Sequence, residues 1–168
     1  IAPGGSRVSI SLFDSEEGTR LEFRHDVETE AVRDLHVMGW RYQLAVFAHV
    51  VSQEQHAGVE AKIDRWFELW AEKDAEQRRR GFVEIAAPYV SFRDAWGCVT
   101  GIDELTSHVG AVQFHMPATV ERRGSVRHAQ GVATSQWSAI ADGKETMKGI
   151  NVFELAPDGK IARVVGMT

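Results

Sequence analysis

The sequence predicts an α+β fold: a cone in which helices pack against a curved antiparallel sheet, preceded by a β-hairpin and a long helix. Three features support this fold class. Two short runs of alternating apolar and polar residues lie near the beginning, apolar residues recur at helical spacing in the middle, and long alternating runs separated by glycine turns fill the last third. The 168 residues suffice for one domain with a sizeable core and part of a second.

The first part of the chain predicts a hairpin followed by one helix. Residues 7–13 and 19–25 alternate in polarity around a turn at 14–18, and Thr29 then opens an apolar-periodic run that continues to about Gln55. A hairpin and one helix cannot enclose a core, so they must pack against the rest of the chain, a second subunit or an upstream segment. The helical pattern breaks after residue 55, which predicts one domain over 1–56 and another over 57–168.

The second part of the chain predicts three helices and a series of strands. An aromatic stripe marks a helix that starts near Val59, Asp74 caps a second helix through Ile85, and Pro88 starts a strand. A third helix ends before Pro117. The alternating runs predict strands over about 118–123, 127–139, 145–155 and 161–165, with turns at 124–125, 141–143 and 156–159.

The composition is that of an acidic globular protein. Hydrophobic residues make up 43% and charged residues 26%, and the net charge is −5, which argues against a protein that binds nucleic acid electrostatically. No apolar run approaches the length of a membrane span, and no signal peptide is visible. The single cysteine, Cys98, excludes an intrachain disulfide and is typical of a reducing compartment, so a cytoplasmic location is expected.

Asp94 is the residue in this sequence most suggestive of chemistry. In the strand that leads to it, Val90 and Phe92 alternate with polar residues, and Asp94 falls on their apolar face. A carboxylate on such a face needs hydrogen bonds, or it becomes a stronger base because water no longer stabilises its charge. Asp94 is therefore either a general base or a strand-end residue that caps the turn at Trp96 and Gly97.

Residues 1–56 carry short motifs that resemble a known family. Gly-Thr-Arg-Leu at 18–21, Arg-His at 24–25 and Arg-Asp-Leu-His at 33–36, which leads to Gly-Trp at 39–40, look like the carboxy-terminal end of the Hsp90-ATPase-activator-homologue branch of the START-like domains. In complete members the long helix closes a cavity walled by a curved sheet. The resemblance implies a partial START-like tail, from which no ligand site is carried over.

The remaining two thirds of the chain resemble the NTF2-like superfamily, and its SnoaL-like members are the closest match. The motifs are Asp-Arg-Trp-Phe at 64–67, Phe-Arg-Asp-Ala-Trp-Gly at 92–97, Gly-Ile-Asp-Glu-Leu at 101–105, and Gly-Ile-Asn-Val-Phe-Glu-Leu-Ala-Pro-Asp-Gly-Lys-Ile at 149–161. The superfamily includes ketosteroid isomerase, polyketide cyclases, dehydratases, epoxide hydrolases and many non-catalytic binders, so the resemblance is more specific for fold than for function.

The ketosteroid-isomerase branch implies that Asp94 is the general base and that Asn151 stands where the family has a protonated Asp that donates a hydrogen bond. Trp66 stands where that branch has a Tyr donor. This departure argues against ketosteroid isomerisation itself and leaves proton abstraction next to another carbonyl. The polyketide-cyclase branch uses an Asp and a His instead, for which His108, His128 and, at the expected rim, His115 are the candidates.

The resemblance also implies a conical apolar pocket. Its expected ligand-binding walls are large apolar side chains: Trp66, Trp70, Tyr89, Phe92, Trp96, Phe114, Trp137, Met147 and Phe153. No zinc spacing, phosphate-binding glycine loop or nucleophile elbow occurs, so we expect neither a metal nor a cofactor.

Two functions are compatible with these features. The first is a cofactor-free acid–base enzyme of the isomerase, cyclase or dehydratase type that acts on a hydrophobic carbonyl compound. The alternative is a module that binds a hydrophobic small molecule without catalysis or that mediates dimerisation. A homodimer through the broad sheet is expected in either case, with the amino-terminal helix adding to that interface, whereas nucleic-acid and membrane partners are not expected.

Overall fold

The computed structural model describes residues 5–16 and 18–168 and forms two compact units, which divide between Val51 and Ser52. The predicted domain boundary lies five residues later, at 56 and 57. His56 belongs with the second unit because its ring is buried there and its Nε2 lies 3.2 Å from the carbonyl oxygen of Ala156. Residue 17, in the predicted hairpin turn, lies outside the described residues.

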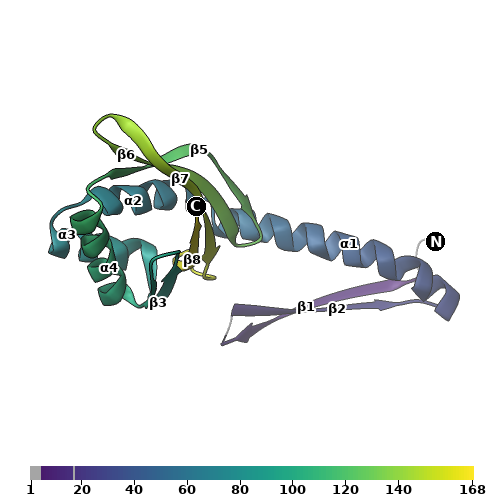
Figure 1. Ribbon diagram of the computed structural model, residues 1–168. Coiled ribbons are helices and arrows are strands. Elements are labelled where there is room, and N and C mark those ends of the chain that lie inside the picture. The colour runs from purple at the N-terminus through teal and green to yellow at the C-terminus, as the bar shows by residue number, and fades with distance from the viewer. Residues whose placement is uncertain (1–4, 17) are drawn as a thin grey trace. The chain divides into compact units, whose positions relative to one another are not determined.

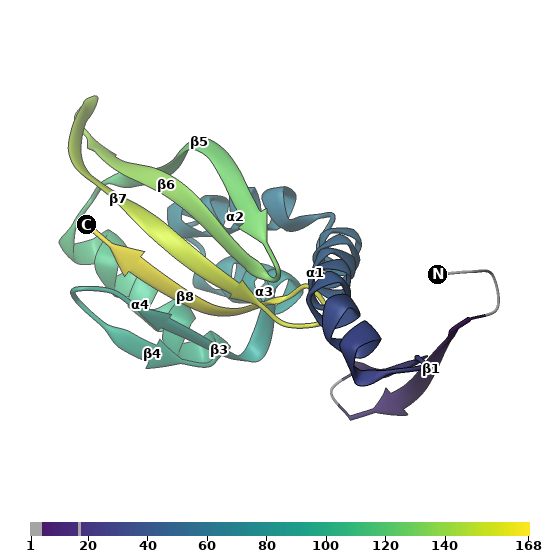
Figure 2. The same ribbon diagram turned by 90° about the vertical axis from the view of Figure 1, so that its right-hand side faces the viewer.

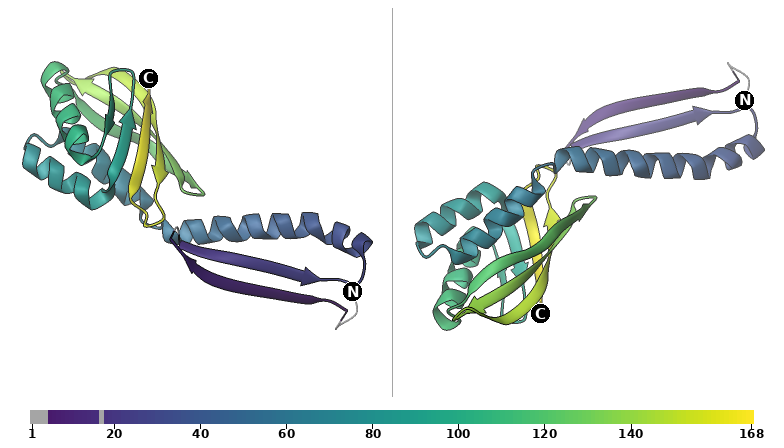
Figure 3. Two further views of the ribbon diagram at one scale, coloured as in Figure 1. Left: turned by 90° about the horizontal axis from the view of Figure 1, so that it is seen from below. Right: turned by 90° about the horizontal axis from the view of Figure 1, so that it is seen from above.

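The first unit consists of a hairpin and most of a long helix. Strands β1 (Arg7–Ser15) and β2 (Gly18–Asp26) pair antiparallel, and α1 (Glu30–Gln55) runs alongside them (Figure 3). Trp40 anchors the helix, because its ring lies 4.3 Å from that of Phe23 and its Nε1 donates a 3.0 Å hydrogen bond to Nδ1 of His25. The predicted hairpin and helix are thus present.

The second unit is a curved six-stranded sheet with three helices on one face (Figures 1 and 2). In chain order, its elements are α2 (Val59–Ala71), α3 (Ala75–Ile85), β3 (Ala86–Arg93), β4 (Cys98–Thr100), α4 (Ile102–His115), β5 (Thr119–Ala129), β6 (Val132–Ala141), β7 (Lys144–Leu155) and β8 (Ile161–Met167). The strand order is β4-β3-β8-β7-β6-β5. The predicted α+β class is confirmed, although the sheet is mixed, because β3 and β8 pair in parallel.

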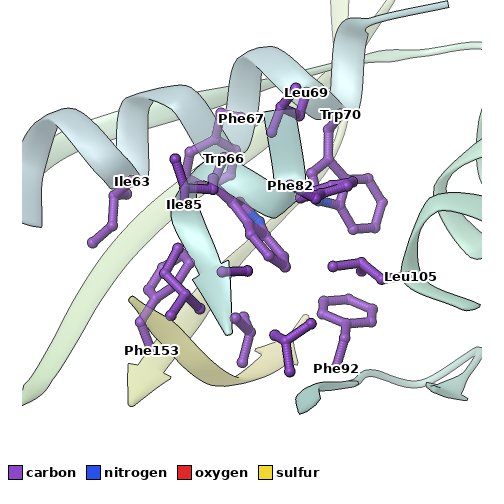
Figure 4. Close-up of a cluster of buried hydrophobic side chains, with 14 of the residues drawn as sticks. Ile63, Trp66, Phe67, Leu69, Trp70, Phe82, Ile85, Phe92, Leu105 and Phe153 are labelled. Carbon is purple, nitrogen blue, oxygen red and sulfur yellow. The ribbon is translucent and has the colours of Figure 1, made fainter. Parts of the chain in front are cut away.

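The core of the second unit lies between the sheet and the helices. Trp66 on α2 is fully buried at its centre, where its ring makes edge contacts with Phe82 of α3 at 5.3 Å and Phe153 of β7 at 5.8 Å (Figure 4). The predicted cap of α3 is also present, since the Asp74 side chain accepts a 2.8 Å hydrogen bond from the backbone N–H of Gln77. This aromatic packing holds the three helices on one face of the sheet.

A buried arginine ties the end of α2 to α3 and α4. Arg78 is 4% exposed and donates to the carbonyl oxygens of Glu72 at 2.7 Å and Thr106 at 3.2 Å. Its Nη1 also donates to Gln113, whose Nε2 donates in turn to the carbonyls of Trp70 and Glu72. Because the carbonyls of Trp70 and Glu72 lie at the end of α2, Arg78 and Gln113 supply hydrogen bonds that the helix itself cannot provide there.

The predicted turn at Gly124 is wrong. Gly124 and Ser125 lie inside β5, at a bulge where the pairing with β6 shifts between Arg123 and Arg127. The chain reverses instead at Gln130 and Gly131, which both have positive φ (48° and 78°). Gly124 also has a positive φ (65°), which a bulge tolerates as well as a turn does, so the glycine alone does not tell the two apart.

No helix among the described residues is long and apolar enough to cross a membrane.

Candidate functional site

A cavity opens between the sheet and the carboxy-terminal end of α4. Its volume is about 100 Å³, which is enough for several waters or for a ligand with a single ring. Apolar side chains from both layers line most of it, including Trp70, Phe92 and Trp137. Trp96, which is 50% exposed, and Met116, at 36%, lie where the lining meets solvent. A ligand there would be mostly apolar.

Asp94 places a carboxylate in this apolar lining. It follows β3 and starts the four-residue turn to Cys98, and its side chain is 9% exposed. The Oδ1 atom accepts hydrogen bonds from the backbone N–H of Trp96 at 2.8 Å and of Gly97 at 2.7 Å. Asp94 therefore caps the turn through Oδ1, as one of the two interpretations from the sequence expects, and Oδ2 takes no part in these two bonds.

Gly166 lies between Asp94 and Asn151, which belong to the strands on either side of β8 or to the turn directly after them. Asn151 on β7 pairs with Gly166 on β8, and β8 in turn pairs with β3 next to Asp94. A Cβ atom at Gly166 would lie 3.1 Å from Oδ1 of Asn151 and 3.4 Å from Cβ of Asp94. Because Gly166 has no side chain, the two polar side chains can lie this close to it on the wall of the cavity.

Asn151 is one of the polar residues in the cavity lining. It is 6% exposed and lines the cavity, and it forms no hydrogen bond with another described residue. A carboxamide can present either its N–H or its carbonyl oxygen after a half-turn of the amide group. Asn151 can therefore donate to a ligand oxygen held above Gly166.

His108 on α4 lies behind Asp94. Its Nε2 is 3.8 Å from Oδ2 of Asp94 and is buried without a hydrogen-bond partner among the described residues. The imidazole packs between the rings of Phe92 at 5.3 Å and Trp70 at 6.2 Å. Gly97 permits this position, because a Cβ there would lie 2.6 Å from Cε1 of His108. His108 does not line the cavity.

Two tryptophans of the lining have unused donors. The Nε1 atoms of Trp70 and Trp137 are buried without a hydrogen-bond partner in the described part of the chain. The Trp137 indole lies against Gly149, its partner on β7, where a Cβ would approach Cζ2 to 2.7 Å. The glycine fixes the indole as one wall of the cavity.

Comparison with solved structures identifies this architecture. A protein from Agrobacterium tumefaciens, named as a candidate isomerase of the SnoaL-like family, aligns with a TM-score of 0.62 and 22% identity over 68% of this chain and 97% of its own. An NTF2-like protein of unknown function from Exiguobacterium aligns with a TM-score of 0.50 and 21% identity, covering 62% of this chain and 95% of its own. The first unit ends at Val51, so alignments that cover 62–68% of this chain must include the second unit. The second unit has the NTF2-like fold.

A protein of unknown function from Methylobium petroleophilum, described as having a cystatin-like fold, adds a third example, with a TM-score of 0.55 and 13% identity over 66% of this chain and 75% of its own. No family model and no curated protein matches the sequence. At these identities the likeness shows the NTF2-like fold alone. The START-like resemblance of residues 1–56 stays a prediction.

The NTF2-like unit brings together only some of the predicted site residues. Asp94 and Asn151 line the cavity, and so do five of the expected walls: Trp70, Phe92, Trp96, Trp137 and Met147. Trp66 and Phe153 are fully buried in the core and lie outside the lining. Tyr89 and Phe114 are 63% and 82% exposed and do not line the cavity.

His128 lies away from Asp94. It pairs across the sheet with Ala133 on β6, and its ring lies 5.2 Å from that of His56. The prediction of one strand over 127–139 was wrong, because the turn at Gln130 places His128 and Ala133 on two strands, directly opposite each other. His128 lines no part of the cavity.

Several lining residues were not singled out from the sequence. They are Phe67, Val112, Gln113, Met116, Ala118, Val120, Ala139, Thr146, Gly166 and Thr168. The sequence could have indicated Gly166, since a glycine within a strand often marks a close approach of other groups. Among the described residues, no group of three or more His, Cys, Asp or Glu side chains is placed to hold a metal ion.

Proposed function

We propose that this protein is a cofactor-free enzyme that moves a proton on a small, mostly apolar carbonyl compound. The observation that carries the proposal is the pair of Asp94 and Asn151, which lie on either side of Gly166 in the wall of a mostly apolar cavity. One residue can accept a proton and the other can stabilise the oxygen that becomes negative. This is the minimal equipment for enolisation.

The proton transfer assigns a separate task to each oxygen of Asp94. Oδ1 is held by two backbone N–H groups, so Oδ2 is the oxygen that accepts the proton. The C–H bond next to the substrate carbonyl breaks, its proton moves to Oδ2, and its electron pair forms the enolate. Asn151 donates its amide N–H to the enolate oxygen. Return of the same proton to another carbon completes an isomerisation without an external reagent.

His108 positions the base. Its Nε2 faces Oδ2 from the side remote from the cavity, at a distance slightly too long for a hydrogen bond. A protonated Oδ2 that rotates or shifts toward His108 gains a buried hydrogen-bond acceptor, which helps to stabilise the proton between its two transfers. The neighbour from Agrobacterium tumefaciens, named as a candidate isomerase, agrees with this class of reaction.

The size of the cavity limits the substrate. A space of about 100 Å³ suits a ligand with one ring, since an engineered apolar cavity of about 150 Å³ in another protein accommodates benzene. The walls formed by Trp70, Phe92 and Trp137 favour a flat ligand. The proposal therefore favours monocyclic ketones and enones over fused polycyclic compounds.

A proton-exchange assay tests this function. Wild-type protein is incubated with a panel of cyclic ketones and enones in D₂O, and deuterium incorporation next to the carbonyl is followed by proton NMR. Asp94→Asn keeps an oxygen that can accept both turn hydrogen bonds but cannot act as the base, so exchange should fall by about 10²–10⁴-fold. Asp103→Asn, at an exposed position of α4, is the matched control and should exchange at the wild-type rate.

A non-catalytic binding module is the second candidate, and the two bonds from the turn to Oδ1 favour it, because they give Asp94 a structural task that needs no catalysis. Ligand titrations followed by tryptophan fluorescence separate the two functions, since three tryptophans line the cavity. Binding without exchange, and equal binding by Asp94→Asn, would support the module and refute the enzyme.

A further inference from the structure

The helix α1 carries apolar residues on two opposite faces. Its inner face meets the hairpin through Val37, Trp40 and Leu44, which together with Phe23 and other hairpin residues line one pocket of the first unit. On the outer face, Leu35 is 79% exposed, Met38 68% and Tyr42 67%. No residue of the helix is fully buried. A helix that is apolar on both sides is typical of an element packed between two layers, of which the hairpin supplies one.

The spacing of the outer residues indicates the kind of layer that is missing. Leu35, Met38, Tyr42, Ala45 and His49 follow one another at steps of three, four, three and four, and we call them the outer stripe. This repeat is the signature of a seam between two helices. Gly39 lies beside the stripe, and no atom lies within 4 Å of the place that a Cβ would take there. Because Ala45 is also small, a second helix can approach closely.

The exposed area matches the requirement of a dimer. At roughly 150–200 Å² per large side chain, Leu35, Met38, Tyr42 and the adjacent Val46 expose on the order of 500 Å² of apolar surface. Two such surfaces in contact bury about 1,000 Å², the area at which specific interfaces begin. The stripe together with Val46 is therefore sufficient for a modest self-association.

The charges of α1 favour a second copy over other partners. The helix contains two arginines and three acidic residues and has no lysine. It therefore lacks the cationic face that an acidic membrane surface or a nucleic acid would need. The outer stripe carries no Asp, Glu, Lys or Arg, so the surface that suits it best is another uncharged helical stripe.

We propose that two copies of this chain pair through the outer stripes of their α1 helices, around a two-fold axis. Each hairpin then lies on the far side of its own helix, and both faces of α1 are covered. The pairing uses the first unit only and does not depend on the function of the cavity.

Sedimentation equilibrium of the full chain tests the proposal. Over about 1–100 μM, the wild type should convert from monomer to dimer. Tyr42→Glu places a charge in the stripe and should raise the dissociation constant by at least about 100-fold. Gln43→Glu adds the same charge at the adjacent exposed position, outside the stripe, and should leave the dissociation constant within about threefold of wild type.

Two outcomes would overturn the proposal. A wild type that remains monomeric up to the highest concentration would mean that the stripe serves another partner. A dimer that Tyr42→Glu leaves intact would run through another surface, such as the sheet. Circular dichroism verifies that the variants keep their helix, and Leu35→Gln, a milder change in the same stripe, replaces Tyr42→Glu if that variant does not fold.

Discussion

His108 and Asp94 face each other across 3.8 Å in the interior of the second unit, with side chains that are only 12% and 9% exposed. Asp94 lies in the turn after β3, and His108 lies on α4, which follows the short strand β4. The carboxylate is fixed from one side by the turn and approached from the other by an imidazole nitrogen that has no other partner in the described chain. This relationship leads to predictions that separate structural from chemical roles.

Replacement of Asp94 should separate folding from catalysis. Asp94→Ala removes the acceptor of two backbone hydrogen bonds and should lower the free energy of unfolding by about 1–3 kcal/mol. Asp94→Asn keeps an acceptor oxygen and should stay within about 1 kcal/mol of wild type. Urea unfolding followed by tryptophan fluorescence measures both values. Equal stabilities of the two variants would show that the turn does not depend on this side chain.

Gly166→Ala should weaken the site while leaving the fold intact. The new Cβ would occupy the space between Asp94 and Asn151, at 3.1 Å from the amide oxygen. We expect ligand affinity to fall by about tenfold and the free energy of unfolding to change by less than about 1.5 kcal/mol. Gly58→Ala is the control, because nothing lies within 4 Å of a Cβ at that position. Unchanged binding by Gly166→Ala would mean that ligands do not use this space.

Gly97→Ala should displace His108. Its Cβ would lie 2.6 Å from the imidazole, which Phe92 and Trp70 confine from other directions. A loss of about 1–3 kcal/mol in the free energy of unfolding is expected, together with slower proton exchange. The position of the His108 ring can be followed by NMR of its Cε1 proton. A normal exchange rate with a shifted ring would remove His108 from the mechanism.

Arg78→Met should destabilise the second unit strongly. The substitution introduces an apolar side chain of similar length and removes the buried donor to the Thr106 carbonyl and one of the two donors to the Glu72 carbonyl, at a cost of about 1–3 kcal/mol. Arg80→Met on the same helix is the comparison, since Arg80 is largely exposed and should contribute less than about 0.5 kcal/mol. Chemical denaturation of the two variants measures the difference.

Much of the fold was accessible from local sequence patterns. The apolar spacing located α2 and α4, and the cap at Asp74 set the start of α3, because these features depend on residues within a few positions of one another. The same holds for the turn that begins at Asp94. The turn was predicted at Gly124 instead of Gly131, because both glycines provide positive φ and only the pairing with β6 makes one a bulge and the other a turn.

The sequence by itself determined the order of the elements, the α+β class and the presence of a carboxylate at the end of an apolar strand face. Only the tertiary structure decided which residues that carboxylate meets. The parallel pairing of β3 with β8 places Gly166 beside Asp94, and the pairing of β8 with β7 places Asn151 one strand further on. Local patterns fix periodicity and turns, whereas a site depends on contacts between strands that are far apart in the chain, and these are settled by packing of the whole core.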